Sequence, residues 1–423
     1  MRLVIKRSHL SGRVEIPASK SHTIRAVFVG CLADGTSELI KPLDSLDTRA
    51  AIRCAEAFGA EVTTGENWKI RGVGGHPRVP ENVVDAANSG TSIMFFTGLA
   101  STLDGYTVLT GDAQVRRRPI QPLLDGLNNL GADAFSTRDT GTPPVVVRGK
   151  LKGGQTDVEG RTSHYTSALL FNCPRAEGDS ELRIENPKEK PYIEMTLGWL
   201  DKQGVKYERD GFSSYSIPGG QQYVPFRERI PGDFSTATFF LCGASITDSD
   251  VMLLGLDMKD TQGDKKVVSF LQEMGADITV KEEGLVIRGG DLKGIELDLG
   301  DTPDALPALA VTGCFARGET KLKNVLSARW KETDRIKVMC QELSKLGARV
   351  EELSDGMIVR ESHLRGGVVN GHGDHRVVMA LSLAGLGSAE GVQVETAEAL
   401  RVTVPNFVDL MKELGTSITV TES

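Results

Sequence analysis

Several positively charged side chains stand where helices are expected to begin. The stretch "IPASKSHTIR" places Lys20, Ser21 and Arg25 after a proline and three small residues, at the start of an apolar run. Cations near the first turn oppose the positive end of a helix dipole. They are favourable there if a strongly anionic ligand binds between them. The segment therefore predicts an anion site.

Three more stretches bring arginines to expected helix starts. "QVRRRPIQPL" contains Arg118, "RWKETDRI" contains Arg335 and "GDHRV" contains Arg376. Arginine binds carboxylates and phosphates through pairs of parallel hydrogen bonds. A charge run such as "RRR" is more often a solvated surface, and "KETDR" has the spacing of structural ion pairs on a helix, with Lys331 and Arg335 on one face.

The same stretches contain groups that can move protons. Asp304 lies in "DTPDALP", Glu332 in "RWKETDR" and His375 in "GDHRV". Carboxylates and histidines are the usual general acids and bases. The phosphate-binding GxxxxGK[ST] loop, the dinucleotide-binding GxGxxG turn and the GxSxG nucleophile elbow are missing. "GHGDH" has no further ligand set for a metal, so we expect neither metal nor cofactor. A transfer between two anionic substrates fits these residues.

A repeated phrase indicates the elements that must position these groups. An amphipathic helix, a glycine and a strand recur with spacings of 72, 73, 71, 72 and 68 residues between the glycines. The six glycines are Gly59, Gly131, Gly204, Gly275, Gly347 and Gly415. Glycine is the usual left-handed residue after a helix, and the near-constant spacing indicates repeated supersecondary units.

A second phrase keeps the same spacing and predicts a buried helix in each unit. These helices are apolar on all sides, as in "SIMFFTGLAS" and "TATFFLCGAS", and such helices pack in the interior. Their openings are "SKSHTIR", "NSGTS", "TSHYTS", "GDFSTA", "DTPDALP" and "GDHRV". Capping alone explains the Ser, Thr, Asn and Asp residues. It does not require Lys20, Arg25, His164, Asp304, His375 or Arg376.

Length and composition narrow the class of protein. A chain of 423 residues usually forms two domains. The net charge of −8 argues against nucleic acid as the main partner, and no apolar run is long enough to cross a membrane. "MRLVIKRSHL" reads as a first strand rather than a targeting segment. The six cysteines have no paired spacing, so reduced, buried thiols in a cytoplasmic protein are expected.

Taken together, the motifs resemble the enolpyruvyl transferase family, and within it the EPSP synthases. The resemblance covers essentially the whole chain. Its motifs occur in the order "PASKSHTIR", "LDSLDTR", "NSGTS", "RRRPI", "EKPYIEMTL", "GDFSTA", "TPDALP", "RWKETDR" and "GDHR". Each motif is weak alone, but the ordered set is specific.

The resemblance implies a two-domain inside-out α/β barrel. Each domain is expected to contain three βαβαββ repeats, with buried parallel helices and the sheets outside, and the two domains close over the substrates. The expected boundaries are 19–229 for one domain, and 1–18 with 230–423 for the other. The resemblance also implies a monomer that binds small molecules.

The implied reaction transfers the enolpyruvyl group of phosphoenolpyruvate to the 5-hydroxyl of shikimate 3-phosphate. The phosphoenolpyruvate clamp is expected to be Lys20, Arg118, Arg335 and Arg376, lined by Asn88, Ser89, Gly90 and Thr91. The acceptor and its phosphate are expected to bind Ser21, Arg25, Thr162, Ser163, His164, Asp304, Ser327 and Lys331. Asp304, assisted by Lys331, takes the hydroxyl proton. Glu332 protonates the methylene carbon, with His375 and Lys20 close by.

Several positions depart from the family pattern. Met94 stands where an arginine is usual, His164 replaces a glutamine, and Ser327 replaces an asparagine. Val402 replaces a lysine of the phosphoenolpyruvate site, and Arg401 beside it is the candidate to compensate. Glu189 replaces a serine that touches the acceptor phosphate. Since two anions repel, Glu189 must point away or the acceptor must be a different one.

Other activities remain open at this point. The nearest alternative is an enolpyruvyl transferase with another hydroxyl acceptor. The enzyme acting on UDP-N-acetylglucosamine fits poorly, because Ala113 stands near the place of its loop cysteine. An RNA 3′-phosphate cyclase shares related repeats but is disfavoured by the acidic net charge. A silent binding protein is disfavoured by the presence of Asp304, Glu332 and Arg376.

Overall fold

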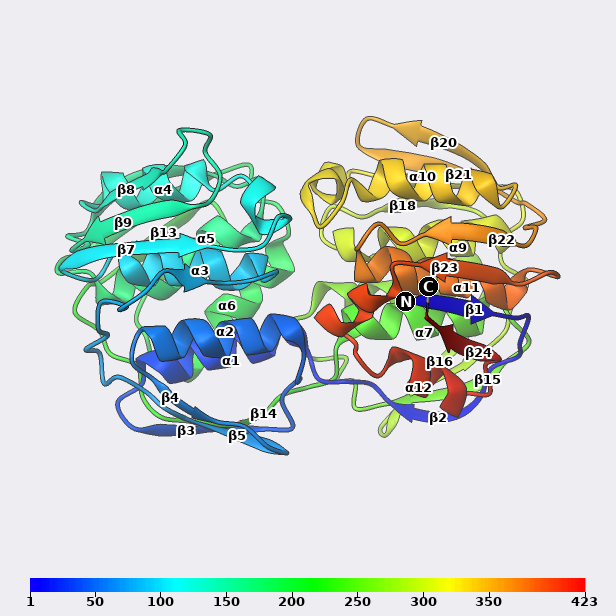
Figure 1. Ribbon diagram of the computed structural model, residues 1–423, viewed down its shortest axis with the longest axis horizontal. Helices are drawn as coiled ribbons and strands as arrows, with labels where there is room; N and C mark the ends of the chain where they lie inside the picture. The colour runs from blue at the N-terminus through cyan, green and yellow to red at the C-terminus, as the bar shows by residue number, and fades with distance from the viewer. Residues whose placement is uncertain (423) are drawn as a thin grey trace. The chain divides into compact units, whose positions relative to one another are not determined.

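The computed structural model describes residues 1–422, which divide into two compact units. The terminal unit contains Met1–Pro17 and Pro231–Ser423, and the central unit contains Ala18–Ile230. Figure 1 follows the chain through both units. Among the described residues, no helix is both long and apolar enough to span a membrane.

The central unit contains three four-stranded sheets. The first has the order β14-β3-β5-β4 and consists of β14 (Arg227–Arg229), β3 (Thr36–Ile40), β5 (Asn67–Arg71) and β4 (Glu61–Thr63). The second consists of β6 (Val84–Asp85), β7 (Gly105–Thr110), β9 (Val145–Gly149) and β8 (Asp133–Ser136). The third consists of β10 (Gly154–Glu159), β11 (Ser180–Glu185), β13 (Ser214–Ile217) and β12 (Glu208–Asp210).

The terminal unit also contains three four-stranded sheets. One consists of β2 (Ser11–Glu15), β15 (Asp250–Leu254), β17 (Gly284–Arg288) and β16 (Asp277–Lys281). The next consists of β18 (Glu296–Asp298), β19 (Glu319–Lys323), β21 (Gly356–Arg360) and β20 (Arg349–Leu353). The last consists of β22 (Gly367–Asn370), β23 (Val392–Glu395), β1 (Arg2–Ile5) and β24 (Ile418–Thr421).

All six sheets share one pairing pattern. The first two strands in each order above are parallel, and the remaining pairs are antiparallel. A parallel pair needs a crossover connection, usually a helix, and an antiparallel pair needs only a short turn. The six predicted βαβαββ repeats are therefore confirmed.

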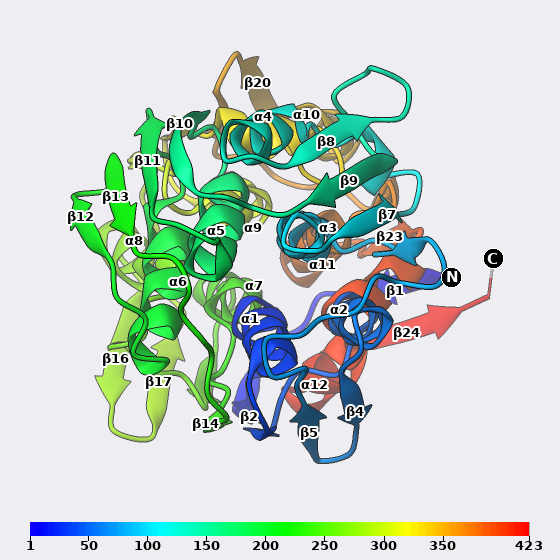
Figure 2. The same ribbon diagram turned by 90° about the vertical axis from the view of Figure 1, so that its left-hand side faces the viewer.

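One helix of each repeat is almost completely buried. These helices are α1 (Lys20–Leu32), α3 (Gly90–Ala100) and α5 (Ser163–Asn172) in the central unit, and α7 (Phe234–Ser245), α9 (Leu306–Phe315) and α11 (His375–Gly387) in the terminal unit. Phe28 of α1 packs on Phe95 and Phe96 of α3 and on Phe171 of α5. Figure 2 shows α1, α3 and α5 with the sheets of their unit around them.

The second helix of each repeat is amphipathic. These helices are α2 (Leu46–Ala57), α4 (Gln121–Asn129), α6 (Lys190–Lys202), α8 (Lys266–Met274), α10 (Arg335–Lys345) and α12 (Phe407–Glu413). The six glycines that follow them all have positive φ, between 67° at Gly204 and 109° at Gly275. Glycine adopts this conformation without a steric penalty, so each glycine ends its helix as predicted.

The chain crosses between the units near its start and in its middle. β1 lies between β23 and β24, and β2 pairs with β15, so both N-terminal strands complete sheets of the terminal unit. In the central unit, β14 lies at the C-terminal end of the segment Ala18–Ile230. It pairs with β3, near the N-terminal end of that segment, and so completes the first sheet. Each unit therefore has three complete sheets around its own apolar core.

Candidate active site

The six buried helices begin at the six polar segments that the sequence predicted. Capping accounts for part of their composition. Ser19, Ser89, Asp233 and Asp374 each accept a backbone N–H through the side chain at the start of α1, α3, α7 and α11. Thr162 makes no such bond at the start of α5. The charged residues at these starts bind side chains of other elements, as Lys20 does with Asp47 and Arg376 with Asp304.

At the start of α1, Lys20 is held by a carboxylate of the central unit. Its Nζ lies 2.9 Å from Oδ2 of Asp47, near the start of α2. Both side chains are largely buried, at 15% and 5% exposure. This pairing fixes the ammonium group at the helix start. Sequence reasoning quoted "LDSLDTR" but gave no role to Asp47.

Arg25 lies one turn further along α1 and contacts α6. Its Nε donates to Oγ1 of Thr196 at 3.0 Å, and one terminal nitrogen donates to the carbonyl of Tyr192 at 3.0 Å. The other donates to the carbonyl of Ser21 at 3.1 Å. Arg25 is buried, and its hydrogen bonds to Thr196 and Tyr192 join α1 to α6. Its predicted contact with the acceptor stays a prediction.

The start of α3 makes room for a guanidinium group. A Cβ built on Gly90 would lie 2.1 Å from Nη1 of Arg118. Arg118 lies between η1 (Val115–Arg117) and Pro119, so the short 3-10 turn sets its position. Ser89 and Thr91 flank Gly90, and Asn88 precedes Ser89. Arg118 and Gly90, both predicted donor-binding residues, therefore lie together at the start of α3, whereas Lys20 lies at the start of α1.

A buried carboxylate occupies the start of α5. Oε2 of Glu189 accepts from the backbone N–H of Ser163 at 3.1 Å and from the hydroxyls of Ser163 and Thr162, both at 3.0 Å. Glu189 is 1% exposed and has a left-handed backbone, with φ of 53°. Of the two alternatives for Glu189, the one in which its side chain points away from the start of α5 is therefore wrong. Its carboxylate takes the donors of the helix start, as a bound anion would.

A chain of hydrogen bonds connects this carboxylate to the start of α3. Because Thr162 donates its one hydroxyl hydrogen to Glu189, the N–H of the His164 ring must donate from Nδ1 to Thr162, across 2.8 Å. In a neutral ring Nε2 is then an acceptor. It receives the hydroxyl of Thr91 at 3.1 Å. His164 thus joins predicted acceptor and donor residues within the central unit.

In the terminal unit, Arg335 is surrounded by carboxylates. It binds Asp304 at 2.7 Å, Glu332 at 2.6 Å and Asp374 at 2.8 Å. Arg335 is 1% exposed and Asp374 is fully buried. Burial alone would lower the pKa of Arg335, but the three carboxylates raise it above the ordinary value. The guanidinium therefore stays charged and holds Asp304 and Glu332 in place.

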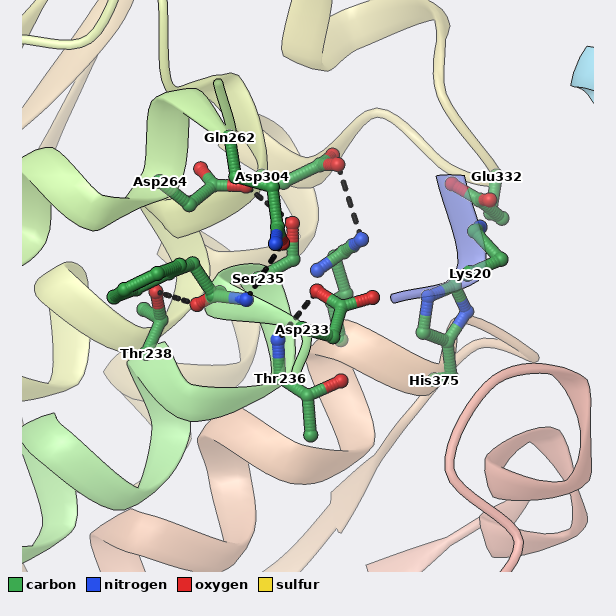
Figure 3. A network of polar contacts seen from close by, with 12 residues as sticks. Lys20, Asp233, Ser235, Thr236, Thr238, Gln262, Asp264, Asp304, Glu332 and His375 are labelled. Carbon is green, nitrogen blue, oxygen red and sulfur yellow. Dashed lines mark hydrogen bonds and ion pairs between the residues drawn. The ribbon is translucent and has the colours of Figure 1, made fainter. Parts of the chain in front are cut away.

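Asp304 binds a second guanidinium. It lies on η4 (Pro303–Ala305), and its Oδ2 is 3.0 Å from Arg376, near the start of α11. Burial would raise the pKa of Asp304, but Arg376, Lys331 and Arg335 together hold it well below the usual range. Asp304 is therefore ionised at neutral pH and can accept a proton (Figure 3).

The remaining predicted residues of the terminal unit lie on neighbouring elements. His375 is the first residue of α11, and its Nδ1 lies 4.0 Å from Oδ1 of Asp374. Ser327 lies on η5 (Leu326–Trp330), and Lys331 follows that turn. Since α10 begins only at Arg335, Lys331 lies outside the helix. The prediction that Lys331 and Arg335 share a helix face is therefore wrong. Within this stretch, it is Glu332 that pairs with Arg335.

Two expectations about the departures can be checked in the structure. Met94 lies inside α3 and is 4% exposed, so it belongs to the core. Arg401 lies on η6 (Ala397–Val402) and is exposed, where its charge lowers the pKa of Glu398. This position gives no support to Arg401 as a substitute for the missing lysine.

In the terminal unit, Asp304, Glu332, Arg335 and Arg376 are joined by ion pairs, and in the central unit the predicted residues lie at the starts of α1, α3 and α5. The profile of the EPSP synthase family, 3-phosphoshikimate 1-carboxyvinyltransferase, matches residues 4–411. The chain belongs to the EPSP synthase family. Within this family, it is 49% identical over 423 residues to the 3-phosphoshikimate 1-carboxyvinyltransferase of Acetivibrio thermocellus, with 100% of both chains covered. It is 41% identical to that of Methanocella arvoryzae, over 98% of this chain and 99% of the relative.

Solved structures agree with this membership in the EPSP synthase family. An EPSP synthase from Acinetobacter baumannii has a TM-score of 0.85 to this chain, at 28% identity, with 100% of both chains covered. The agreement over the full length of both chains confirms the predicted two-domain α/β fold.

Proposed function

We propose that this EPSP synthase family member transfers the enolpyruvyl group of phosphoenolpyruvate to the 5-hydroxyl of shikimate 3-phosphate. The products are 5-enolpyruvylshikimate 3-phosphate and phosphate, a step of chorismate and aromatic amino acid biosynthesis. The observation that carries the proposal is the pair of carboxylates, Asp304 and Glu332, held on one guanidinium. The pair supplies a base and an acid beside cations that attract anionic substrates.

The donor is assigned to cations from both units. Phosphoenolpyruvate carries a carboxylate and a phosphate of nearly two negative charges at neutral pH. Lys20 and Arg118 of the central unit, and Arg335 and Arg376 of the terminal unit, supply the countercharges. Gly90 supports this assignment, because it leaves space for the Arg118 guanidinium at the start of α3. Asn88 and Thr91 line the same helix start.

The acceptor is assigned to the neighbouring helix starts. Ser21 and Arg25 of α1, with Thr162, Ser163 and His164 of α5, would bind shikimate 3-phosphate. Ser327 and Lys331 would contact it from the terminal unit. The hydroxyls and backbone N–H at the start of α5 suit a phosphate, because they already bind a carboxylate oxygen.

The chemistry proceeds by addition and elimination. Asp304 takes the proton of the attacking hydroxyl while the hydroxyl oxygen of the acceptor forms a bond to C2 of phosphoenolpyruvate. Glu332, in its protonated form, gives a proton to C3, which becomes a methyl group, and we assign His375 and Lys20 to assist this step. The tetrahedral ketal phosphate then loses phosphate from C2 and a proton from C3, which restores the double bond as an enol ether. The proton lost from C3 returns to Glu332, and Asp304 passes the proton of the hydroxyl to the departing phosphate, so both residues regain their starting protonation states.

Phosphate release tests the proposal. The purified chain, with phosphoenolpyruvate and a panel of acceptor alcohols, should release phosphate only with shikimate 3-phosphate, and without added metal. Release with a different alcohol would favour the second candidate, a transferase for another acceptor. That candidate has one specific observation in its favour, since Glu189 lies where the acceptor phosphate would bind. Absence of release with every alcohol would contradict both.

We also propose that the chain acts as a cytoplasmic monomer that does not bind nucleic acid. Complete sheets within one chain support a monomer. The six cysteines are free and buried, and free cysteines are typical of a protein in a reducing compartment. Burial raises the pKa of each thiol to about 12. Light scattering should give a mass near 45.6 kDa. A mass of twice that value would contradict the monomer.

A further inference from the structure

A further buried carboxylate, Asp264, lies in the terminal unit and has no role in the scheme above. Asp264 lies on η3 (Gly263–Lys265), just before α8, and is 1% exposed. Figure 3 shows Asp264 in one polar network with Ser235, Asp233 and Asp304. A carboxylate buried this deeply must affect the charges around it, because little water screens them.

The position of Asp264 is fixed by the residue two places before it. The side chain of Gln262 accepts the backbone N–H of Phe234 at 2.8 Å and donates to the carbonyl of Gly232 at 2.9 Å. These two bonds hold η3 against the start of α7. The hydroxyl of Ser235 then donates to Oδ2 of Asp264. The carboxylate is therefore placed by the fold and not by a flexible loop.

The charged groups around Asp264 come from three other elements. Asp233 precedes α7, Asp304 lies on η4 and Arg376 lies at the start of α11, and the charge of each acts on Asp264. On its own element, the ammonium of Lys265 points elsewhere, to the carbonyls of Met258 and Asp260. Arg376 is thus the cation that Asp264 and Asp304 share.

This arrangement separates the two carboxylates in their affinity for protons. Burial raises the pKa of Asp264, Asp304 and Asp233 raise it further, and Arg376 and the Ser235 hydroxyl oppose them, with a result of about 6. The pKa of Asp304 is held well below the usual range. A pair whose environments separate their pKa values in this way divides the proton chemistry between its members.

We propose that Asp264 is a positioning residue that controls how Arg376 is divided between Asp304 and the anionic donor substrate. The proposal rests on the proposed function. When Asp264 is ionised, it partly neutralises Arg376 and repels the charge of Asp304. Asp304 then binds a proton more strongly, and Arg376 attracts an anion less strongly. When Asp264 is protonated, both effects are reversed.

Two kinetic constants should therefore rise together as Asp264 loses its proton: a higher kcat favours catalysis, whereas a higher KM for phosphoenolpyruvate disfavours it. As the pH rises through about 6, the pKa of Asp264, kcat should rise because Asp304 becomes a better base. Over the same range, KM for phosphoenolpyruvate should rise because Arg376 holds the donor less strongly. The phosphate of the donor itself titrates near this pH, so the wild type must be compared with variants on the same substrate.

The decisive variant is Asp264→Asn, which keeps the shape and removes the charge. At pH 8 its kcat and its KM for phosphoenolpyruvate should both be several-fold below wild type, and the two proteins should converge at pH 5. Ser235→Ala removes a donor to the ionised form, so it should move the transition to higher pH. Asp257→Asn, an exposed aspartate in the preceding loop, serves as the control and should match wild type.

The two variants keep the proposal open to refutation even if one fails to fold. A ratio of Asp264→Asn to wild type that is constant from pH 5 to 8 would overturn it, as would an unmoved transition in Ser235→Ala. Calorimetric binding of phosphoenolpyruvate over the same pH range gives a readout without turnover. Binding without transfer to any acceptor would refute the proposed function alone. Binding with the same pH dependence in both proteins would refute the role of Asp264 alone.

Discussion

At the scale of single residues, Arg335 determines the geometry of the candidate site. One guanidinium binds Asp304, Glu332 and Asp374, which come from three separate segments. All three contacts are at 2.8 Å or less. Because Arg335 is itself buried, a carboxylate that is ionised beside it in the interior depends on its positive charge.

We therefore expect Arg335→Gln to destabilise the protein strongly. Removing one member of a buried ionic cluster leaves uncompensated charge and typically costs about 3–5 kcal/mol. The control is Arg317→Gln, which removes an exposed ion pair with Asp291 and should cost less than about 1 kcal/mol. Urea unfolding of both variants measures the difference. Equal losses would show that the cluster does not stabilise the terminal unit.

Glu189 gives a second prediction at this scale. The carboxylate competes with an acceptor phosphate for the donors at the start of α5. Glu189→Gln removes the negative charge and should lower KM for shikimate 3-phosphate about tenfold, which corresponds to roughly 1.4 kcal/mol. Glu185→Gln changes an exposed glutamate nearby and is the matched control. A higher KM in Glu189→Gln would mean that the carboxylate helps to bind the acceptor.

Sequence reasoning found the chemical groups but not their internal partners. Lys20, Asp304, Glu332 and Arg376 were predicted from residue type and from their place at helix starts. Asp47, Asp374 and Asp264 were missed, because each acts through a contact with a segment far away in the chain. Their signal was present in "LDSLDTR", "GDHR" and "TQGDKK", but nothing in those letters says which cation each carboxylate meets.

At the scale of elements, the starts of the buried helices are the common feature of the site. The sequence predicted all six, because apolar helices of similar length follow polar openings at a regular spacing. The glycines with positive φ confirm where the outer helices end. The start of α10 was harder to predict. Lys331 to Asp334 precede the helix, and Asp334 caps it through the N–H of Lys337 at 3.0 Å.

The start of α3 carries the prediction at this scale. In Gly90→Ala, the new Cβ would lie 2.1 Å from the Arg118 guanidinium, which must move. One hydrogen bond to a charged group is worth roughly 1.5–3 kcal/mol, so KM for phosphoenolpyruvate should rise about tenfold or more. Gly198→Ala on α6 is the control, because a Cβ there meets nothing within 4 Å. An unchanged KM in Gly90→Ala would remove Arg118 from the donor site.

At the scale of the whole molecule, the chain builds six copies of one motif. The same strand order and pairing recur in all six sheets, although β1, β2 and β14 reach their sheets from distant parts of the chain. The repeat could be predicted because glycine spacing survives in the sequence. The exchange of the N-terminal strands leaves no periodic signal, since it pairs distant segments, and it was expected only from the family resemblance, which joined residues 1–18 to 230–423.

The repeats present polar helix starts in both units, and the proposed reaction uses groups from each. The account therefore stands or falls with the transfer of an enolpyruvyl group by addition and elimination. Its intermediate has a methyl group at C3, formed with a proton that exchanges with solvent. Since the elimination can remove an original hydrogen as well as the added one, product released from this intermediate includes molecules with solvent hydrogen in the methylene group.

The most direct measurement is mass spectrometry of the product formed in D2O. Phosphoenolpyruvate and shikimate 3-phosphate should give phosphate and an enol ether in equal amounts, with deuterium in the methylene group of the enol ether. An enol ether without deuterium would contradict the roles given to Asp304 and Glu332. Absence of the enol ether would contradict the proposed transfer itself.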